Sequence, residues 1–173
     1  MPRSTTSTAL TTTTAPTTTV PDTTTLPPST TTIDVPLPDA TGQDWLHIAT
    51  ELEQFAGWLF ENPDPELVSE WAVEGSSAYE TLYPLISESF ENGWRDLPGG
   101  RAEVLNAEFV TGDVESGSAV IEVATHYDGA TTVDADGNVV LEEPGRGVAT
   151  SQWLLAQGSD GRWRVRDIMR VEQ

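Results

Sequence analysis

The sequence predicts an α+β fold in which three N-terminal helices pack on a curved, antiparallel, four-stranded sheet. Apolar residues recur at helical spacing between about positions 42 and 92, and at a spacing of two beyond position 101. Turn dipeptides divide the second half into strands. All six Trp, three Tyr and four Phe lie beyond position 44, so that part of the chain can supply a hydrophobic core.

Residues 1–40 are predicted to be a disordered, Thr/Pro-rich stalk, and residues 41–173 to be one domain. The stalk holds 16 Thr before position 33 and seven of the twelve Pro, with no aromatic residue and one basic residue, Arg3. Such a segment cannot bury enough apolar surface to offset the entropy of ordering it. Its composition is typical of extended, often O-glycosylated stalks on exported proteins.

The first helix is expected over about 42–61. Thr41 and Asp44 resemble a capping pair at its start, and Asn62-Pro63 ends it. Asp64, followed by Pro65, then has the composition of an N-cap and first helical position, which predicts a short second helix.

The third helix begins at a predicted capping box made by Ser77 and Glu80. It stops at Asn92-Gly93, because Gly readily adopts the left-handed conformation that ends helices. Pro84 inside this helix should bend it.

Four strands follow. The first is expected over 102–111 and the fourth over 162–171. Between them the second strand starts near 118 and the third ends near 157. Asp136-Gly137 is a strong two-residue hairpin signal between the second and third strands. A hairpin centred there brings Asp128-Gly129 opposite Pro144-Gly145. Two facing breaker dipeptides predict one long hairpin with a shared bulge or bend.

The turn positions also predict two sheet faces, provided that both loops are two residues long. The more apolar face, expected to meet the helices, holds Ala119, Ile121, Val123, Thr125, Tyr127, Val148, Thr150, Gln152, Leu154, Trp163, Val165, Asp167 and Met169. The outer face holds Val120, Glu122, Ala124, His126, Ser151, Trp153, Leu155, Arg162, Arg164, Arg166 and Ile168.

Three helices followed by an antiparallel meander form a known order of elements. Two segments accompany it here: Asn62-Pro63-Asp64-Pro65 between the first two helices, and a closing strand that starts Gly161-Arg162-Trp163-Arg164-Val165. In residues 42–171 the chain resembles the nuclear-transport-factor-2-like superfamily, the cystatin-like cone that includes SnoaL-like proteins. The resemblance implies a bent sheet that wraps the helices, with a pocket at its open end. It implies no single activity, since such cones include isomerases, dehydratases, hydrolases and non-enzymatic binding modules.

Polar residues on the predicted inner face are the candidate pocket: Thr125, Tyr127, Thr150, Gln152 and Asp167. Within a cavity, Asp167 could act as a carboxylate base and Tyr127 as a hydrogen-bond donor to an oxyanion. The alternative interpretation places Asp167 at the rim or beside an arginine and makes the threonines ordinary strand residues.

The outer face carries the candidate interface: Trp153, Leu155, Arg164 and Arg166. The predicted register places Arg166 against Trp153, which favours stacking of guanidinium on indole. Related cones often dimerise through this face, so a homodimer is one hypothesis, and a solvated face balanced by glutamates is the other.

Composition excludes several classes of site. Without cysteine there is no disulfide, thiol catalysis or cysteine zinc site. His47 and His126 have no partners at ligand spacing, so neither metal nor cofactor is expected. The net charge of -20 disfavours nucleic acid and anionic membranes as partners. All eight basic residues are Arg, which suggests GC-rich coding and an actinobacterial-type source.

The leading hypothesis is a non-catalytic module of an exported, stalk-tethered protein that binds a small ligand or a protein. A small isomerase or dehydratase using Asp167 and Tyr127 and a structural homodimer are the alternatives. No signal peptide or membrane segment precedes the stalk, so an extracellular or cell-envelope location implies an upstream signal or anchor. A cytoplasmic protein with a disordered leader is the other possibility.

Overall fold

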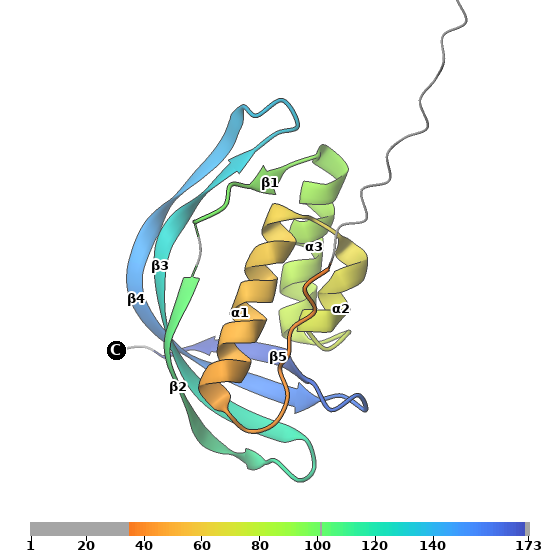
Figure 1. Cartoon of the computed structure of the whole chain (residues 1–173), viewed down its shortest axis with the longest axis vertical. Helices are drawn as coiled ribbons and strands as arrows, with labels where there is room; N and C mark the ends of the chain where they lie inside the picture. The colour runs from red at the N-terminus through yellow and green to blue at the C-terminus, as the bar shows by residue number, and fades with distance from the viewer. Residues whose placement is uncertain (1–34, 101, 172–173) are drawn as a thin grey trace, which may run out of the picture. The chain divides into compact units, whose positions relative to one another are not determined.

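The predicted α+β fold is confirmed by the computed structural model, which describes residues 35–100 and 102–171 (Figure 1). Its helices are α1 (Trp45–Glu61), the 3-10 turn η1 (Pro65–Leu67), α2 (Val68–Trp71) and α3 (Ser77–Asn92). Its strands are β1 (Arg95–Asp96), β2 (Ala102–Asp113), β3 (Ser118–Val133), β4 (Val139–Gln157) and β5 (Trp163–Arg170). No helix among the described residues has the length and apolarity to cross a membrane.

The compact unit begins at Val35, earlier than the predicted domain start at 41. Pro38 and Ala40 are buried, and the Ala40 carbonyl accepts a hydrogen bond from the backbone N–H of Trp163. This approach segment therefore belongs to the fold. Of the stalk predicted over residues 1–40, residues 1–34 lie outside the described residues, so their predicted disorder stays a prediction.

Capping side chains set the helix starts one to three residues from the predicted positions. Asp44, rather than Thr41, caps α1 by accepting a hydrogen bond from the backbone of His47 at 3.1 Å. Ser76, rather than Ser77, caps α3. The predicted cap at Asp64 and the predicted stop at Gly93 are both confirmed, and Gly93 adopts φ 67°.

The sheet has five strands rather than four. Its order is β1-β3-β4-β5, and β2 also pairs with β3. The extra strand β1 has only two residues, too few for a periodicity signal, and pairs with the far end of β3. The long β3–β4 hairpin curls around α1, and β5 crosses at its base (Figure 1).

The predicted bend in this hairpin is confirmed. Gly129 pairs with Pro144, and the register shifts between Tyr127 and Gly129. Beyond the bend Ala130 pairs with Glu143, in the predicted register. Below it Tyr127 pairs with Gly147, one residue out of that register, because β4 carries an extra residue at Gly145–Arg146.

This one-residue shift makes the predicted faces of β4 wrong. Ile121 pairs with Trp153 and Ala119 with Leu155, so Trp153 and Leu155 share the inner face with the β3 core residues. Thr150, Gln152 and Leu154 consequently lie on the outer face. A bulge inverts the orientation of every side chain beyond it, and turn positions alone could not reveal one. The assumed two-residue loops are also wrong, because residues 134–138 separate β3 from β4 and residues 158–162 separate β4 from β5.

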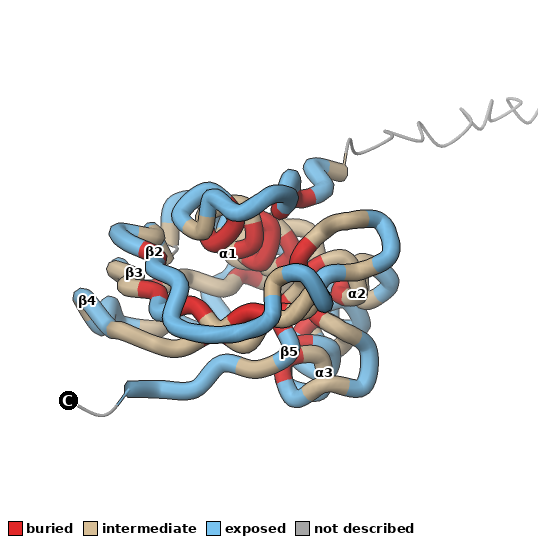
Figure 2. The backbone as a smooth tube through the Cα atoms, turned by 90° about the horizontal axis from the view of Figure 1, so that it is seen from below, coloured by how far each residue is buried: buried red, intermediate tan, exposed pale blue. Residues whose placement is uncertain are grey.

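The core lies between α1 and the concave face of the sheet, where buried residues gather (Figure 2). Its largest fully buried side chains include Phe55, Leu52 and Trp163, and Trp153 is only 2% exposed. All buried residues among those described are apolar or glycine. Trp163 also donates its indole N–H to the Gly42 carbonyl at 2.9 Å, which holds the approach segment on the core.

Candidate functional site

The predicted inner pocket is divided between the two faces of the sheet. Thr125 and Tyr127 keep their inner-face positions on β3, half-buried, and pair with Ala149 and Gly147. Thr150 and Gln152 lie on the opposite face because of the extra residue in β4 at Gly145–Arg146. Whether Thr125 and Tyr127 bind a ligand stays a prediction.

Asp167 and Tyr127 do not come together. Asp167 pairs with Leu154 on β4, whereas Tyr127 pairs with Gly147. Those β4 positions are seven residues apart, which is about 23 Å along a strand. A base and an oxyanion donor acting on one substrate need to lie within hydrogen-bond reach of it, so this pair cannot serve one small molecule.

Each of these two side chains has a structural partner. Asp167 Oδ1 accepts a hydrogen bond from Ser77 Oγ at 2.6 Å, which ties the start of α3 to β5. Tyr127 donates its hydroxyl to Glu143 Oε2 at 2.8 Å, and the guanidinium of Arg146 lies 5.4 Å from its ring centroid. Burial, followed by the hydrogen bond to Glu143, raises the pKa of Tyr127 to about 12. Tyr127, Glu143 and Arg146 therefore brace the bend.

The predicted interface patch does not form as one surface. Trp153 and Leu155 are buried, and the Trp153 indole donates to Ser151 Oγ at 3.0 Å instead of stacking on an arginine. The exposed Arg166 occupies the shift in register between β4 and β5. The homodimer hypothesis therefore loses its two apolar anchors.

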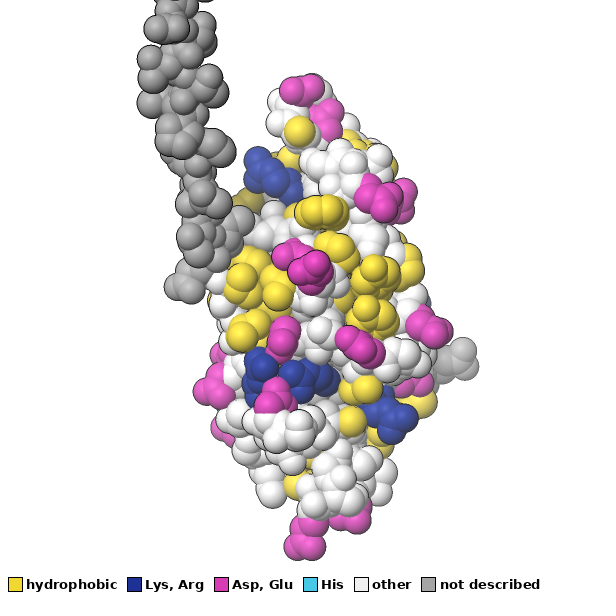
Figure 3. Space-filling model, turned by 90° about the vertical axis from the view of Figure 1, so that its right-hand side faces the viewer, with side chains coloured by type: hydrophobic (Ala, Val, Ile, Leu, Met, Phe, Trp, Pro, Cys, Tyr) yellow, Lys and Arg dark blue, Asp and Glu magenta, His cyan; other side chains and the backbone are white. Residues whose placement is uncertain are grey.

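Arg164 belongs to an ion-pair network that joins α2 to the β4–β5 turn. Figure 3 shows basic and acidic side chains next to each other on this side of the molecule. It contacts Asp160 at 2.8 Å and Glu70 at 3.2 Å, and donates to the Ser69 carbonyl at 2.9 Å. Arg162 reaches the same two carboxylates at 2.9 and 2.8 Å. These arginines hold the pKa of Asp160 well below its usual range, chiefly through the hydrogen bond from Arg164. Their structural role leaves them poorly placed to attract an external anion.

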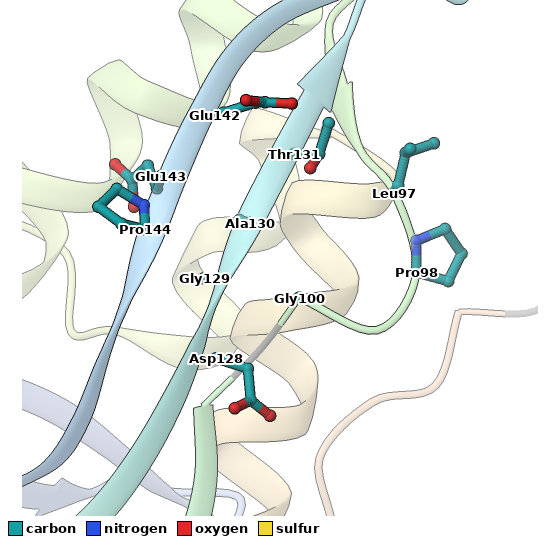
Figure 4. Close-up of a pocket in the computed structure, with 10 residues that line it drawn as sticks. All are labelled: Leu97, Pro98, Gly100, Asp128, Gly129, Ala130, Thr131, Glu142, Glu143 and Pro144. Atoms are coloured by element: carbon teal, nitrogen blue, oxygen red, sulfur yellow. The ribbon is translucent and has the colours of Figure 1, made fainter.

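A cleft of about 550 Å³ crosses the bend of the hairpin (Figure 4). Its volume lies within the range of ordinary ligand pockets. Three segments line it, namely the β1–β2 connection, β3 and β4, through Leu97, Pro98, Gly100, Asp128, Gly129, Ala130, Thr131, Glu142, Glu143 and Pro144.

Glycines allow the three segments to approach so closely. A Cβ on Gly100 would lie 2.8 Å from Ala130 Cα, and one on Gly129 would lie 2.9 Å from the Gly145 nitrogen. Gly129 also has φ 103°, which L side chains rarely adopt. The facing dipeptides signalled this bend in the sequence, but Leu97 and Pro98 carried no signal, since their segment is irregular.

The charged side chains among the described lining residues are carboxylates. Asp128, Glu142 and Glu143 line it together with Thr131, and none of the arginines that the structure describes does. Among the described residues, no group of three or more His, Asp or Glu side chains is arranged to hold a metal ion. His126 lies beside Asp128, with Nδ1 3.5 Å from Oδ1, and His47 lies 4.0 Å from Asp39.

Together, the three helices and the curled antiparallel sheet form an α+β, cone-like fold, which is the architecture that the resemblance seen in the sequence implied. No protein-family model matches the chain, and no curated protein matches it.

Solved structures of similar fold include the intermembrane space region of the chloroplast protein ARC6, with 12% identity over 69% of this chain and 89% of that one and a TM-score of 0.49. Aln2 from a Streptomyces species shows 16% identity over 70% of this chain and 87% of that one, with a TM-score of 0.42. A protein from Catenulispora acidiphila shows 15% identity over 72% and 80%, with a TM-score of 0.31. These likenesses concern the fold alone.

Proposed function

We propose that this domain is a non-catalytic binding module whose ligand site is the cleft at the bend of the β3–β4 hairpin. The observation that carries the proposal is the cleft itself, about 550 Å³ of open space floored by backbone and small residues. Glycines at its floor let the three segments pack closely, and β3 and β4 are paired on both sides of the bend. A preformed concave surface on a rigid scaffold is the usual setting for a binding site.

The chemistry around the cleft supports binding rather than catalysis. General acid–base groups usually have a pKa shifted by burial toward the working pH. In the described part of the chain no ionisable side chain is buried. The pKa of Tyr127 is raised to about 12, far above neutral pH. Its hydroxyl would therefore remain protonated and act only as a hydrogen-bond donor.

The proposal includes export on a stalk. Residues 1–34 combine repeated Thr with Pro and lack aromatic residues, which is the composition of tethers that hold a domain away from a surface. The acidic, lysine-free domain would remain soluble and monomeric there. Fractionation of cells that produce the full-length protein should recover it in the envelope or the medium, and recovery in the cytoplasm alone would refute this part.

A screen of small molecules and short peptides against the full chain tests the binding site. Amide chemical shifts report where each ligand lies, because a bound ligand perturbs the nearest backbone groups. Hits should change the amide chemical shifts of Ala130, Thr131 and Glu142, at the floor and wall of the cleft. The reasoning fails if hits map only to the region of Ser77 and Asp167, or if that region supports turnover that Asp167→Asn abolishes.

A further inference from the structure

We propose that the cleft receives a basic segment of a partner protein, in which Lys or Arg neighbours an aliphatic residue. This inference rests on the proposed function and names the partner of that same site. Three features support it, namely the charge of the cleft, its apolar walls and the poor fit of a second copy.

The charge of the cleft favours a cation. Glu142 is exposed, and its side chain has no hydrogen bond or ion pair among the described residues. Glu143 is shared between Tyr127 and Arg146, 2.8 and 3.6 Å away, and Asp128 faces His126. An incoming ammonium or guanidinium would therefore meet Glu142 first and would have the other two carboxylates nearby. Opposite charge at a rim steers association and selects the partner.

Apolar residues make the cleft more than a cation site. Leu97 is 40% exposed on one wall, with Pro98 beside it, and Pro144 forms the other wall. Ala130 and the glycines form a floor without polar side chains. An aliphatic side chain next to the basic one would cover these groups, because burial of apolar surface stabilises a complex. A bare metal ion or a simple amine would leave them exposed.

A second copy of this chain fits the cleft poorly. Each copy carries a net charge of -20 and contains no lysine. Among its described arginines, Arg162 and Arg164 are held by Glu70 and Asp160, and Arg146 lies beside Glu143. Arg95, Arg166 and Arg170 are exposed, but they belong to a molecule whose net negative charge opposes its approach to an acidic cleft. Strand addition is also disfavoured next to the cleft, since Pro144 lacks an N–H and the extra residue at Gly145–Arg146 distorts the edge of β4. We therefore expect the cleft to bind the side chains of a different protein.

Short synthetic peptides test the inference on the full chain. The probe is a hexapeptide that alternates Lys and Leu, and the control peptide carries Glu in place of Lys. The third ligand is spermidine, which offers the cationic groups without the aliphatic side chains. Binding is measured by fluorescence anisotropy for the peptides and by amide shifts for all three ligands, at low and at physiological salt.

The Lys peptide should bind in the cleft and shift the amides of Ala130 and Glu142, more tightly than spermidine, and the Glu peptide should not bind. Glu142→Lys should weaken the Lys peptide about tenfold, since it replaces an attraction by a repulsion at the rim. The matched control is Glu122→Lys, which changes the net charge equally. Glu122 is exposed on β3 six residues from Asp128, about 20 Å away along the strand. Glu122→Lys should change the Kd of the Lys peptide less than twofold.

Equal weakening by both variants would show diffuse attraction to an acidic surface and would overturn the inference. Equal affinity for spermidine would assign the cleft to a free polyamine and would also overturn it. If neutral ligands occupy the cleft and charge has no effect, the proposed function survives and the basic partner is excluded. If nothing binds in the cleft, both proposals fail.

Discussion

Alanine at Gly129 should weaken the domain far more than alanine at Gly137, although both glycines have positive φ. Gly129 has φ 103° and Gly137 has φ 84°, so each substitution costs about 1–2 kcal/mol of backbone strain. A Cβ on Gly137 meets nothing within 4 Å. A Cβ on Gly129 meets the Glu143 carbonyl and lies 2.9 Å from the Gly145 nitrogen.

The Cβ at Gly129 can be accommodated only if β3 and β4 move apart at the bend. Two or three ladder hydrogen bonds would be weakened, at about 1 kcal/mol each, so the excess cost over Gly137→Ala is about 2–3 kcal/mol. For a domain of this size that corresponds to a Tm about 6–12 °C below that of Gly137→Ala.

Thermal unfolding followed by tryptophan fluorescence measures this difference, because all six Trp lie beyond position 44. Gly137→Ala is the matched control for backbone strain. Equal Tm values for the two variants would mean that the strands do not approach as closely as the structure shows, and would remove the glycine floor from the account of the cleft.

Two further predictions concern the core and the brace at the bend. Trp153→Glu should unfold the domain, as seen by circular dichroism. It removes a large side chain that is 2% exposed and buries a charge, at a cost of more than about 4 kcal/mol. A folded variant with an altered oligomeric state would instead support the outer-face position of Trp153. Tyr127 should ionise near pH 12 in an absorbance titration. Since its folded pKa lies above the unfolded value of 10, its contribution to stability is complete below about pH 10 and is lost as the pH rises through 12. Tyr127→Phe should flatten that loss, and an unchanged alkaline profile would argue against the raised pKa that burial and the hydrogen bond to Glu143 produce together.

The candidate site was only partly visible in the sequence. The facing dipeptides Asp128-Gly129 and Pro144-Gly145 predicted a bend, and the cleft lies over it. Its third wall was not predicted, because Leu97 and Pro98 lie in an irregular connection that no periodicity marks. The catalytic pairing of Asp167 with Tyr127 assumed one common pocket. An extra residue in β5 at Arg166 pairs Asp167 with Leu154, seven β4 positions from the Gly147 that pairs with Tyr127.

The interface prediction failed for the same reason. Trp153 was placed outside by counting residues from the turn at Asp136-Gly137, and the count was one residue short beyond the bulge. Arg164 was expected on an open ridge, but Glu70 and Asp160 engage it. The first of these partners lies 94 residues away in the sequence, so no local pattern indicated it.

The sequence by itself determined the ends of the helices to within a few residues, the turns, the bend and the α+β fold. These depend on groups a few residues apart, such as a capping carboxylate and the N–H that it meets, or on the period of apolar positions. Only the tertiary structure decided which face of β4 is buried, which side chains surround the cleft and which arginines are paired. Those outcomes depend on contacts between distant segments, and a single extra residue in one strand is enough to invert them.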